Sequence, residues 1–190
     1  MRPVRSILAI TIIAITTPSL AHTEQHHFSG FAAGLSHPFA GLDHVLAMVS
    51  VGLLAALTGG RAAWAMPAGF IAMMLMGGAM GMMEMNIPAV EAGIAASITI
   101  LGALIAWGHS WHPAAATALA GSFALFHGYA HGIEIPEGSG VLSYGVGFAL
   151  ASLALHLLGL AMGAGLARQS PASRISGVAV TLAGLWVAFG

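Results

Sequence analysis

Six stretches of this chain are long, apolar and almost free of charge, and they restrict its fold more than any other feature. They cover approximately residues 29–57, 62–83, 87–107, 113–133, 141–167 and 174–189. About 20 apolar residues in a helix cross the ~30 Å hydrocarbon core of a bilayer, and a helix pairs its own backbone polar groups there. Only 6% of the residues are charged, whereas soluble domains contain about 25%. We therefore predict an all-α, polytopic membrane helix bundle with six transmembrane helices.

The first 21 residues, MRPVRSILAITIIAITTPSLA, have the pattern of a secretory signal peptide. Two arginines precede an apolar run, which ends in small residues, as such peptides do. We expect cleavage after Ala21, so that residues 1–21 are the signal peptide and residues 22–190 the transmembrane domain. The alternative is an uncleaved first transmembrane helix. After cleavage the mature chain would begin at His22, outside the cytoplasm.

The few arginines indicate the orientation of the bundle. If the mature N-terminus is outside, the loops after the first, third and fifth stretches lie in the cytoplasm. Arg61 falls in the first of these loops, and Arg168 and Arg174 bound the last. This distribution is what the positive-inside rule requires, and it predicts a periplasmic mature N-terminus.

Residue types that are absent exclude several functions. The chain contains no cysteine, which excludes disulfides, thiolate metal sites and thiol nucleophiles. It contains no lysine and only five arginines, so no basic patch is available for nucleic acid. The chain also contains ten histidines, many for a membrane protein of this size, and imidazole is a ligand for transition-metal ions.

The segment FHGYAHGIE, at the end of the fourth apolar stretch, contains a first cluster of metal-binding side chains. His127, His131 and Glu134 recur at a spacing that places them on one face of a helix. Imidazole and carboxylate are ligands for borderline divalent ions such as nickel, cobalt and zinc. Gly128 and Gly132 are expected to leave room beside the ligands. The alternative is a pair of structural histidines bonded to neighbouring carbonyl groups.

The segment HPFAGLDH, in the first apolar stretch, contains a second cluster. His37 and His44 lie seven positions apart, on one face of an ideal helix. Pro38 and Gly41 stand between them, and proline interrupts regular helical pairing. A broken helix could aim Asp43 and both histidines at one point, as interrupted helices do at transporter binding sites.

Three further ionisable residues lie outside these two clusters. Glu91 lies about one turn inside the third stretch, where it either extends outward to water or relays ions to the site. His22, at the mature N-terminus, is a candidate accessory residue for metal capture, and the alternative is an exposed histidine without a role. His156 stands alone in the fifth stretch, and we expect it to be a hydrogen-bonded structural histidine.

Small residues and methionines are expected to pack the helices together. Gly77 and Gly81 form a GxxxG pair, and Ala161 and Gly165 continue a similar pattern; such pairs let helix backbones approach closely in lipid. A methionine stripe also follows a helical spacing, and we interpret it as core packing rather than a Cu(I) site. It consists of Met73, Met76, Met80 and Met83.

The two histidine clusters lie on the first and fourth stretches, which run in opposite directions through the membrane. Three helices per half would then give two inverted three-helix halves, an arrangement typical of transporters. Both clusters fall toward the outer side, where together they would form one ion site.

Within these two clusters the sequence resembles the HupE/UreJ family of nickel and cobalt permeases. The family's pattern of His, five residues and Asp-His is met from His37 to Asp43 and His44. Its pattern Phe-His-Gly-x-Ala-His-Gly-x-Glu is met throughout residues 126–134. The resemblance implies a secondary transporter that imports Ni²⁺, or alternatively Co²⁺, across the bacterial inner membrane for hydrogenase or urease assembly. Spacing alone predicts only a divalent-metal site in a membrane bundle.

We therefore predict a transporter and not an enzyme, with no permanently bound cofactor. Its partners would be the metal ion and the lipid bilayer, with no nucleic acid, and self-association is left open. An intramembrane metalloenzyme of the zinc hydrolase or di-iron oxidase type is the alternative, and a metal sensor is a third. The predicted metal ligands are His37, Asp43, His44, His127, His131 and Glu134.

Overall fold

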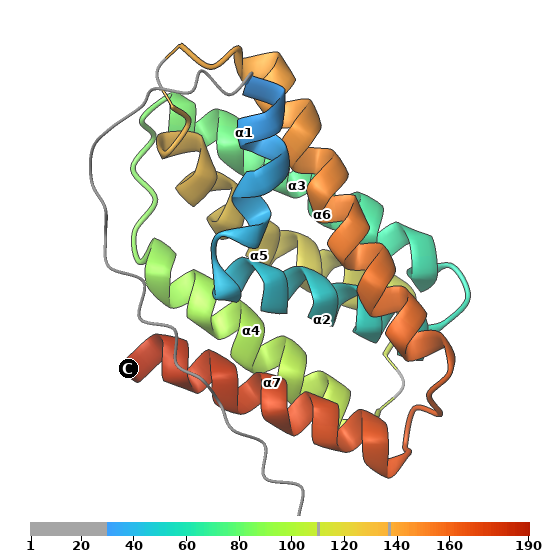
Figure 1. Cartoon of the computed structure of the whole chain (residues 1–190). Coiled ribbons are helices and arrows are strands. Elements are labelled where there is room, and N and C mark those ends of the chain that lie inside the picture. The colour runs from blue at the N-terminus through green and yellow to red at the C-terminus, as the bar shows by residue number, and fades with distance from the viewer. Residues whose placement is uncertain (1–29, 110, 137) are drawn as a thin grey trace, which may run out of the picture.

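All regular structure in residues 30–109, 111–136 and 138–190, which the computed structural model describes, is helical (Figure 1). The signal-peptide prediction and His22 lie outside these residues. The all-α fold class is confirmed. The elements are α1 Gly30–Ser36, the 3₁₀ helix η1 His37–Phe39, α2 Leu42–Thr58, α3 Ala62–Met82, α4 Val90–Trp107, α5 Pro113–Ile133, α6 Val141–Ala164 and α7 Pro171–Phe189.

Four of the helices, α3, α4, α6 and α7, are each long and apolar enough to cross a membrane. A fifth span results if α1 with η1 and α2 is counted as one span, although the two parts are bent by 79°. The predicted count of six is not confirmed. Helix α5 has 21 residues, but its histidines, hydroxyl groups and glycines reduce its hydropathy.

Helix boundaries follow local capping chemistry. Helix α7 begins at Pro171, three residues earlier than predicted, because the Ser170 side chain accepts a hydrogen bond from the Ser173 N–H; this is the N-cap interaction that starts a helix. Helix α4 begins at Val90 rather than at residue 87. Ala89 before it has φ 56°, a left-handed conformation that cannot continue a helix.

The closest helix pair is α3 with α5, and glycines make the contact. A Cβ atom on Gly77 would meet the Leu125 backbone, and one on Gly81 would meet the Tyr129 carbonyl. The predicted packing role of this pair is confirmed. The prediction that Gly128 and Gly132 leave room beside the ligands is wrong. They lie directly against the backbones of Met74 and Gly78, where any side chain would push α5 away from α3.

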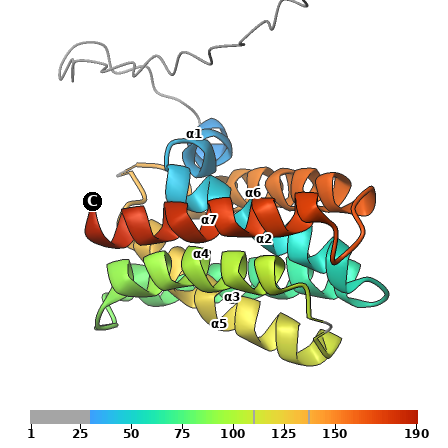
Figure 2. The ribbon, with the colours of Figure 1, turned by 90° about the horizontal axis from the view of Figure 1, so that it is seen from below.

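Helix α6 packs on α2 through different small residues from those predicted. Gly52 lies against the His156 carbonyl, and Gly159 lies against α2 in the same way. Ala161 and Gly165 are exposed, so their predicted packing role is wrong. At one edge of the bundle, α4 and α7 lie side by side (Figures 1 and 2).

The methionine stripe does not lie in the core of the bundle. Met76 and Met83 are 47% and 72% exposed, and Met73 and Met80 are half-buried. The core-packing interpretation is therefore wrong for Met76 and Met83. Met74, one position away from the stripe, is the α3 methionine that is buried beside the site.

Arg168 joins the end of α2 to the loop after α6. Its Nε donates to the Leu57 carbonyl at 2.6 Å, and Nη2 donates to the Thr58 carbonyl at 2.9 Å. Cations stabilise the carbonyl end of a helix. Arg61 follows the same helix end, whereas Asp43 lies in the first turn of α2. The arginine end of the bundle is thus opposite the end that holds the candidate site.

Candidate metal-binding site

The candidate site begins where the first apolar stretch bends. Helix α1 ends in η1, which contains His37 and Pro38, and α2 starts again after Gly41. A Cβ atom on Gly41 would meet the Asp43 carboxylate at 2.5 Å and the His44 ring at 3.0 Å, so a larger residue would displace both side chains. The predicted interruption is confirmed. The two histidines do not share one helical face; the bend brings them together.

Four histidine rings form a continuous row between this bend and α5. The ring centroids of His37 and His131 are 4.7 Å apart, those of His131 and His44 are 4.1 Å apart, and those of His44 and His127 are 5.3 Å apart. We call His37, His131, His44 and His127 the histidine row. The two stretches HPFAGLDH and FHGYAHGIE therefore meet in space as predicted.

The two ends of the histidine row differ in burial. At its outer end the side chains of His37 and Glu134 are 25% and 57% exposed. His44 and His131 are buried, and His127 has 0% exposure. The row therefore leads from the surface into the interior of the bundle.

Three donors converge at the outer end of the row. His37 Nε2 lies 3.4 Å from Glu134 Oε2, and the ligand atoms of His37, His131 and Glu134 all lie within 4.8 Å of one another. Both ring nitrogens of His131 are buried, and neither has a hydrogen-bond partner within residues 30–109, 111–136 and 138–190. Leaving such a group unpaired costs about 1–3 kcal/mol, which a bound ion would offset.

Hydrogen bonds determine the tautomers at the inner end. Ser97 Oγ donates its single hydrogen to the Ile94 carbonyl at 2.6 Å, so it can only accept from His127 Nε2 at 2.8 Å. A neutral His127 then has a lone pair on Nδ1, which lies 3.2 Å from His44 Nδ1. His44 must therefore donate across this gap. Asp43 Oδ2 lies 3.4 Å from the same His44 nitrogen.

The separation of His44 and His127 also suits a shared metal ion. Two imidazole nitrogens that each lie about 2.1 Å from one ion are roughly 3.0–3.4 Å apart. The 3.2 Å distance between the two Nδ1 atoms falls in this range. An ion could replace the shared proton with little movement of either ring, and Asp43 would balance its charge.

Sequence analysis missed Ser97, which orients His127 from α4. Partners behind a metal ligand commonly fix its tautomer and ring orientation. The signal in the sequence is a hydroxyl group inside an apolar stretch, but its partner His127 lies 30 positions away in the chain. Phe148 on α6 was also missed; its ring centroid lies 4.4 Å from that of His131.

Glu91 is not brought to the histidine row. It lies in the first turn of α4 with an exposed side chain. Within the described residues, it is not part of the group of donors that meets at the row. Its position agrees with the alternative that its carboxylate extends outward to water.

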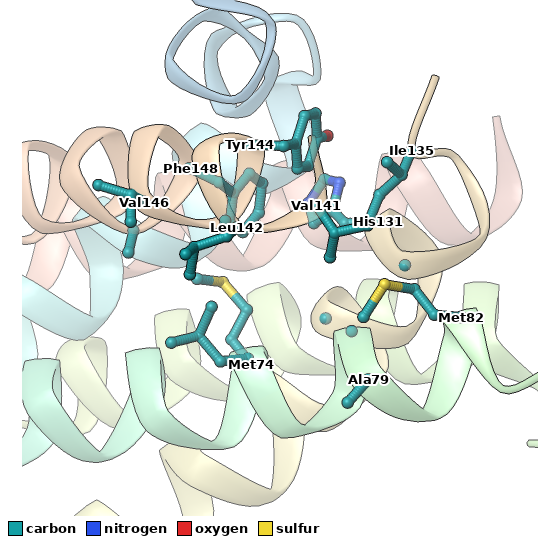
Figure 3. Close-up of a pocket in the computed structure, with 16 residues that line it drawn as sticks. Met74, Ala79, Met82, His131, Ile135, Val141, Leu142, Tyr144, Val146 and Phe148 are labelled. Carbon is teal, nitrogen blue, oxygen red and sulfur yellow. The ribbon is translucent and has the colours of Figure 1, made fainter. Parts of the chain in front are cut away.

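A pocket of about 290 Å³ opens beside the row between α3, α5 and α6. Figure 3 shows the rings of His131, Tyr144 and Phe148 around it, with Met74 contributed by α3. Its walls are almost entirely apolar, so it suits hydrocarbon better than an ion. We therefore place the candidate metal site in the histidine row, which shares only His131 with this pocket.

His156 forms the hydrogen bond predicted for a structural histidine. Its Nδ1 lies 2.5 Å from the Ser152 carbonyl oxygen of the same helix. The ring is fully buried, but within the described part of the chain its Nε2 has no hydrogen-bond partner. A purely structural role therefore accounts for only one of its two nitrogens.

The apolar helices and the buried histidine row define the class: an all-helical, multi-pass membrane protein with a buried cluster of metal-binding side chains. The chain belongs to the HupE / UreJ protein family, whose sequence profile matches residues 10–187. It is 42% identical over 183 residues to Protein HupE of Rhizobium leguminosarum bv. viciae, covering 94% of this chain and 95% of that protein. No solved structure matches the chain. The family resemblance seen in the two histidine motifs is confirmed.

Proposed function

We propose that this protein is a secondary transporter that imports a divalent transition-metal ion, Ni²⁺ or alternatively Co²⁺. One observation carries the proposal: the histidine row extends without a gap from the half-buried His37, beside the exposed Glu134, to the fully buried His127. Ionisable side chains inside membrane helices are costly and usually functional. A row that leads inward supplies successive ligands for an ion that enters from one side.

The donor chemistry supports a transition metal over a hard cation. Imidazole suits nickel, cobalt and zinc, whereas calcium and magnesium prefer oxygen ligands. The ion would first bind His37, His131 and Glu134, where the donors are accessible. It would then pass to His44 and His127 and displace their shared proton, because metal ligands must be deprotonated.

The topology that we propose has six spans, with α5 as the sixth. Its His127, His131 and Gly128 are buried against other helices, so these three residues lower its hydropathy without facing lipid. The arginine end, with Arg61 and Arg168, would be cytoplasmic. The mature N-terminus would be periplasmic, after signal-peptide cleavage, in a bacterial inner membrane.

The packing also supports two inverted three-helix halves. The proposed repeat relates α2 to α5, α3 to α6 and α4 to α7. Under this relation the α2–α6 pair corresponds to the α5–α3 pair. The relation leaves the α4–α7 pair unchanged. These three pairs are among the most extensive contacts of the bundle. The histidine row would then lie where the two halves meet, as in transporters built from inverted repeats.

The physiological role that we propose is metal supply to a metalloenzyme such as a hydrogenase or urease. It rests on membership of the HupE / UreJ family and on similarity to Protein HupE along nearly the whole chain. The metal is the transported substrate in this proposal, and it is not a resident cofactor.

Flux measurements in liposomes test the proposed function. The purified protein is reconstituted around a metal-sensitive dye, and Ni²⁺, Co²⁺, Zn²⁺ and Cu(I) are added outside in separate runs. We expect Ni²⁺ or Co²⁺ entry above that of empty liposomes. Tight, stoichiometric metal retention without flux would instead support the metalloenzyme, and reversible binding without flux would support a sensor.

A further inference from the structure

His156 is a buried histidine that the histidine row does not include. Its Nδ1 faces the Ser152 carbonyl oxygen at 2.5 Å, and a carbonyl group can only accept. In the neutral ring Nδ1 therefore holds the hydrogen, and Nε2 has a free lone pair. That nitrogen is buried and has no hydrogen-bond partner among the residues that the structure describes. The ring is thus oriented by one nitrogen while the other stays available as a ligand.

His156 lies deeper in the bundle than the row. Along α6 it follows Phe148, which contacts His131, by eight residues. Its carbonyl group lies against Gly52, which follows His44 by eight residues on α2. Eight helical residues span about 12 Å, and both helices give the same depth.

Phe70 on α3 connects the inner end of the row with His156. Its ring centroid lies 5.9 Å from that of His127 and 5.1 Å from that of His156. The Phe70 side chain is fully buried. An ion that leaves His127 and moves deeper would therefore pass this ring before it reaches His156.

A thioether lies beside Ser152, which precedes His156 by four residues on α6. Met74 is one turn from Phe70 on α3, and its Sδ lies 3.9 Å from Ser152 Oγ. The backbone of the same serine holds the His156 ring. Thioether and imidazole are both ligands for transition-metal ions, and Met74 is buried.

We propose that His156 Nε2 is an inner coordination point for the transported divalent metal ion, reached from His127 past Phe70. The inference rests on the proposed transport function and extends its path. One imidazole and one thioether offer fewer ligands than the row. The inner point therefore binds weakly, which suits release, because conduction requires sites that an ion can leave.

The substitution His156→Asn distinguishes the roles of the two ring nitrogens. The asparagine amide can still donate to the Ser152 carbonyl, but it has no ligand atom in the place of Nε2. We expect Ni²⁺ binding by the row, measured by equilibrium dialysis in detergent, to stay within about twofold of the wild type. Flux into liposomes should fall by about tenfold or more, as for other losses around metal ligands. Met74→Leu, which keeps the volume, should reduce flux less.

A thiol at the same position gives a readout that a structural role would not change. The chain contains no cysteine, so His156→Cys introduces a single thiol. We expect Cd²⁺ to slow its alkylation by a membrane-permeant maleimide, and His131→Ala in the same chain to reduce this protection. This measurement also decides the question if His156→Asn does not fold, which thermal unfolding would reveal.

The outcomes distinguish this inference from the proposed function. Two results would overturn the inner coordination point and leave the proposed transport function intact. One is metal flux in His156→Asn equal to that of the wild type, and the other is alkylation of His156→Cys that Cd²⁺ does not slow. A wild-type protein that transports none of the metals would overturn both.

Discussion

His44 and His127 face each other across α2 and α5 with their Nδ1 atoms 3.2 Å apart, although 83 positions separate them in the chain. The hydroxyl group of Ser97 fixes the tautomer of His127, and His44 donates into the gap. The gap therefore holds one proton in the metal-free protein and has the width that one metal ion needs. A helix break on one side and a glycine contact on the other bring these two rings together.

Ser97→Ala removes the acceptor for His127 Nε2. The buried N–H group would lose its partner, at a cost of about 1–3 kcal/mol in unfolding free energy. The ring would no longer be restricted to one tautomer, and we expect Ni²⁺ affinity to fall about tenfold. Equilibrium dialysis measures the affinity, and thermal unfolding measures the stability.

Ser122→Ala is the matched control for Ser97→Ala. Ser122 also donates to the carbonyl group three residues earlier, at 2.7 Å, but its side chain is exposed. The affinity of the Ser122→Ala variant for Ni²⁺ should equal that of the wild type. Equal losses of affinity in both variants would contradict the role assigned to Ser97.

Gly128→Ala tests the close approach of α5 to α3. The added Cβ atom would collide with the Met74 backbone, and overpacking of this kind typically costs about 1–3 kcal/mol. Because His127 directly precedes Gly128 in the chain, the displacement of α5 should also weaken Ni²⁺ binding. Thermal unfolding in detergent and dialysis would detect the two effects.

Gly145→Ala provides the comparison within another helix of the bundle. Gly145 lies inside α6, and among the described residues no atom beyond its neighbours and its own helix backbone lies within 4 Å of a Cβ atom built there. Alanine is favoured over glycine in helices by up to about 1 kcal/mol, so this variant should be at least as stable as the wild type. If it were destabilised as much as Gly128→Ala, the contact with α3 would not be the cause.

Arg168→Gln tests the connection between α2 and the loop after α6. The change removes the two charged donors to the carbonyl groups of Leu57 and Thr58. Hydrogen bonds from charged groups contribute about 1.5–3 kcal/mol, so the melting temperature should fall. Arg61→Gln changes an exposed arginine at the same end and should have a smaller effect; a larger effect would contradict the prediction.

The outer pair His37 and Glu134 should be coupled. Their side chains approach to 3.4 Å and share one proposed ion. In a double-mutant cycle with His37→Asn and Glu134→Gln, the change in Ni²⁺ binding free energy should be non-additive by about 0.5–3 kcal/mol. Additive effects, measured by dialysis on the four proteins, would show that the two residues do not bind a common ion.

Much of the helix pattern could be predicted from the sequence because apolar length is a direct requirement of the bilayer. Helix α5 has the predicted bounds of residues 113–133, since Pro113 begins it and polar residues follow it. The break at Pro38 and Gly41 was also predictable, because proline disrupts helical pairing. Helical spacing then placed His127 and His131 on the face that meets this break.

Which face of each helix points to the core could not be predicted in the same way. In a membrane both the buried and the lipid-facing sides are apolar, so composition does not distinguish Met74 in the core from the exposed Met76. Small residues were equally ambiguous, since Gly159 makes a contact and Gly165 does not. Ser97 was missed for a related reason: its partner, His127, lies 30 positions away in the chain.

Ni²⁺ flux into liposomes that contain His131→Ala is the most direct test of the histidine row. His131 contacts both His37 and His44, so its loss interrupts the row at its centre. Glu84→Gln, which removes an exposed carboxylate near the end of α3, is the control. We predict that His131→Ala reduces flux about tenfold or more while Glu84→Gln transports like the wild type. Wild-type flux through His131→Ala would contradict the account.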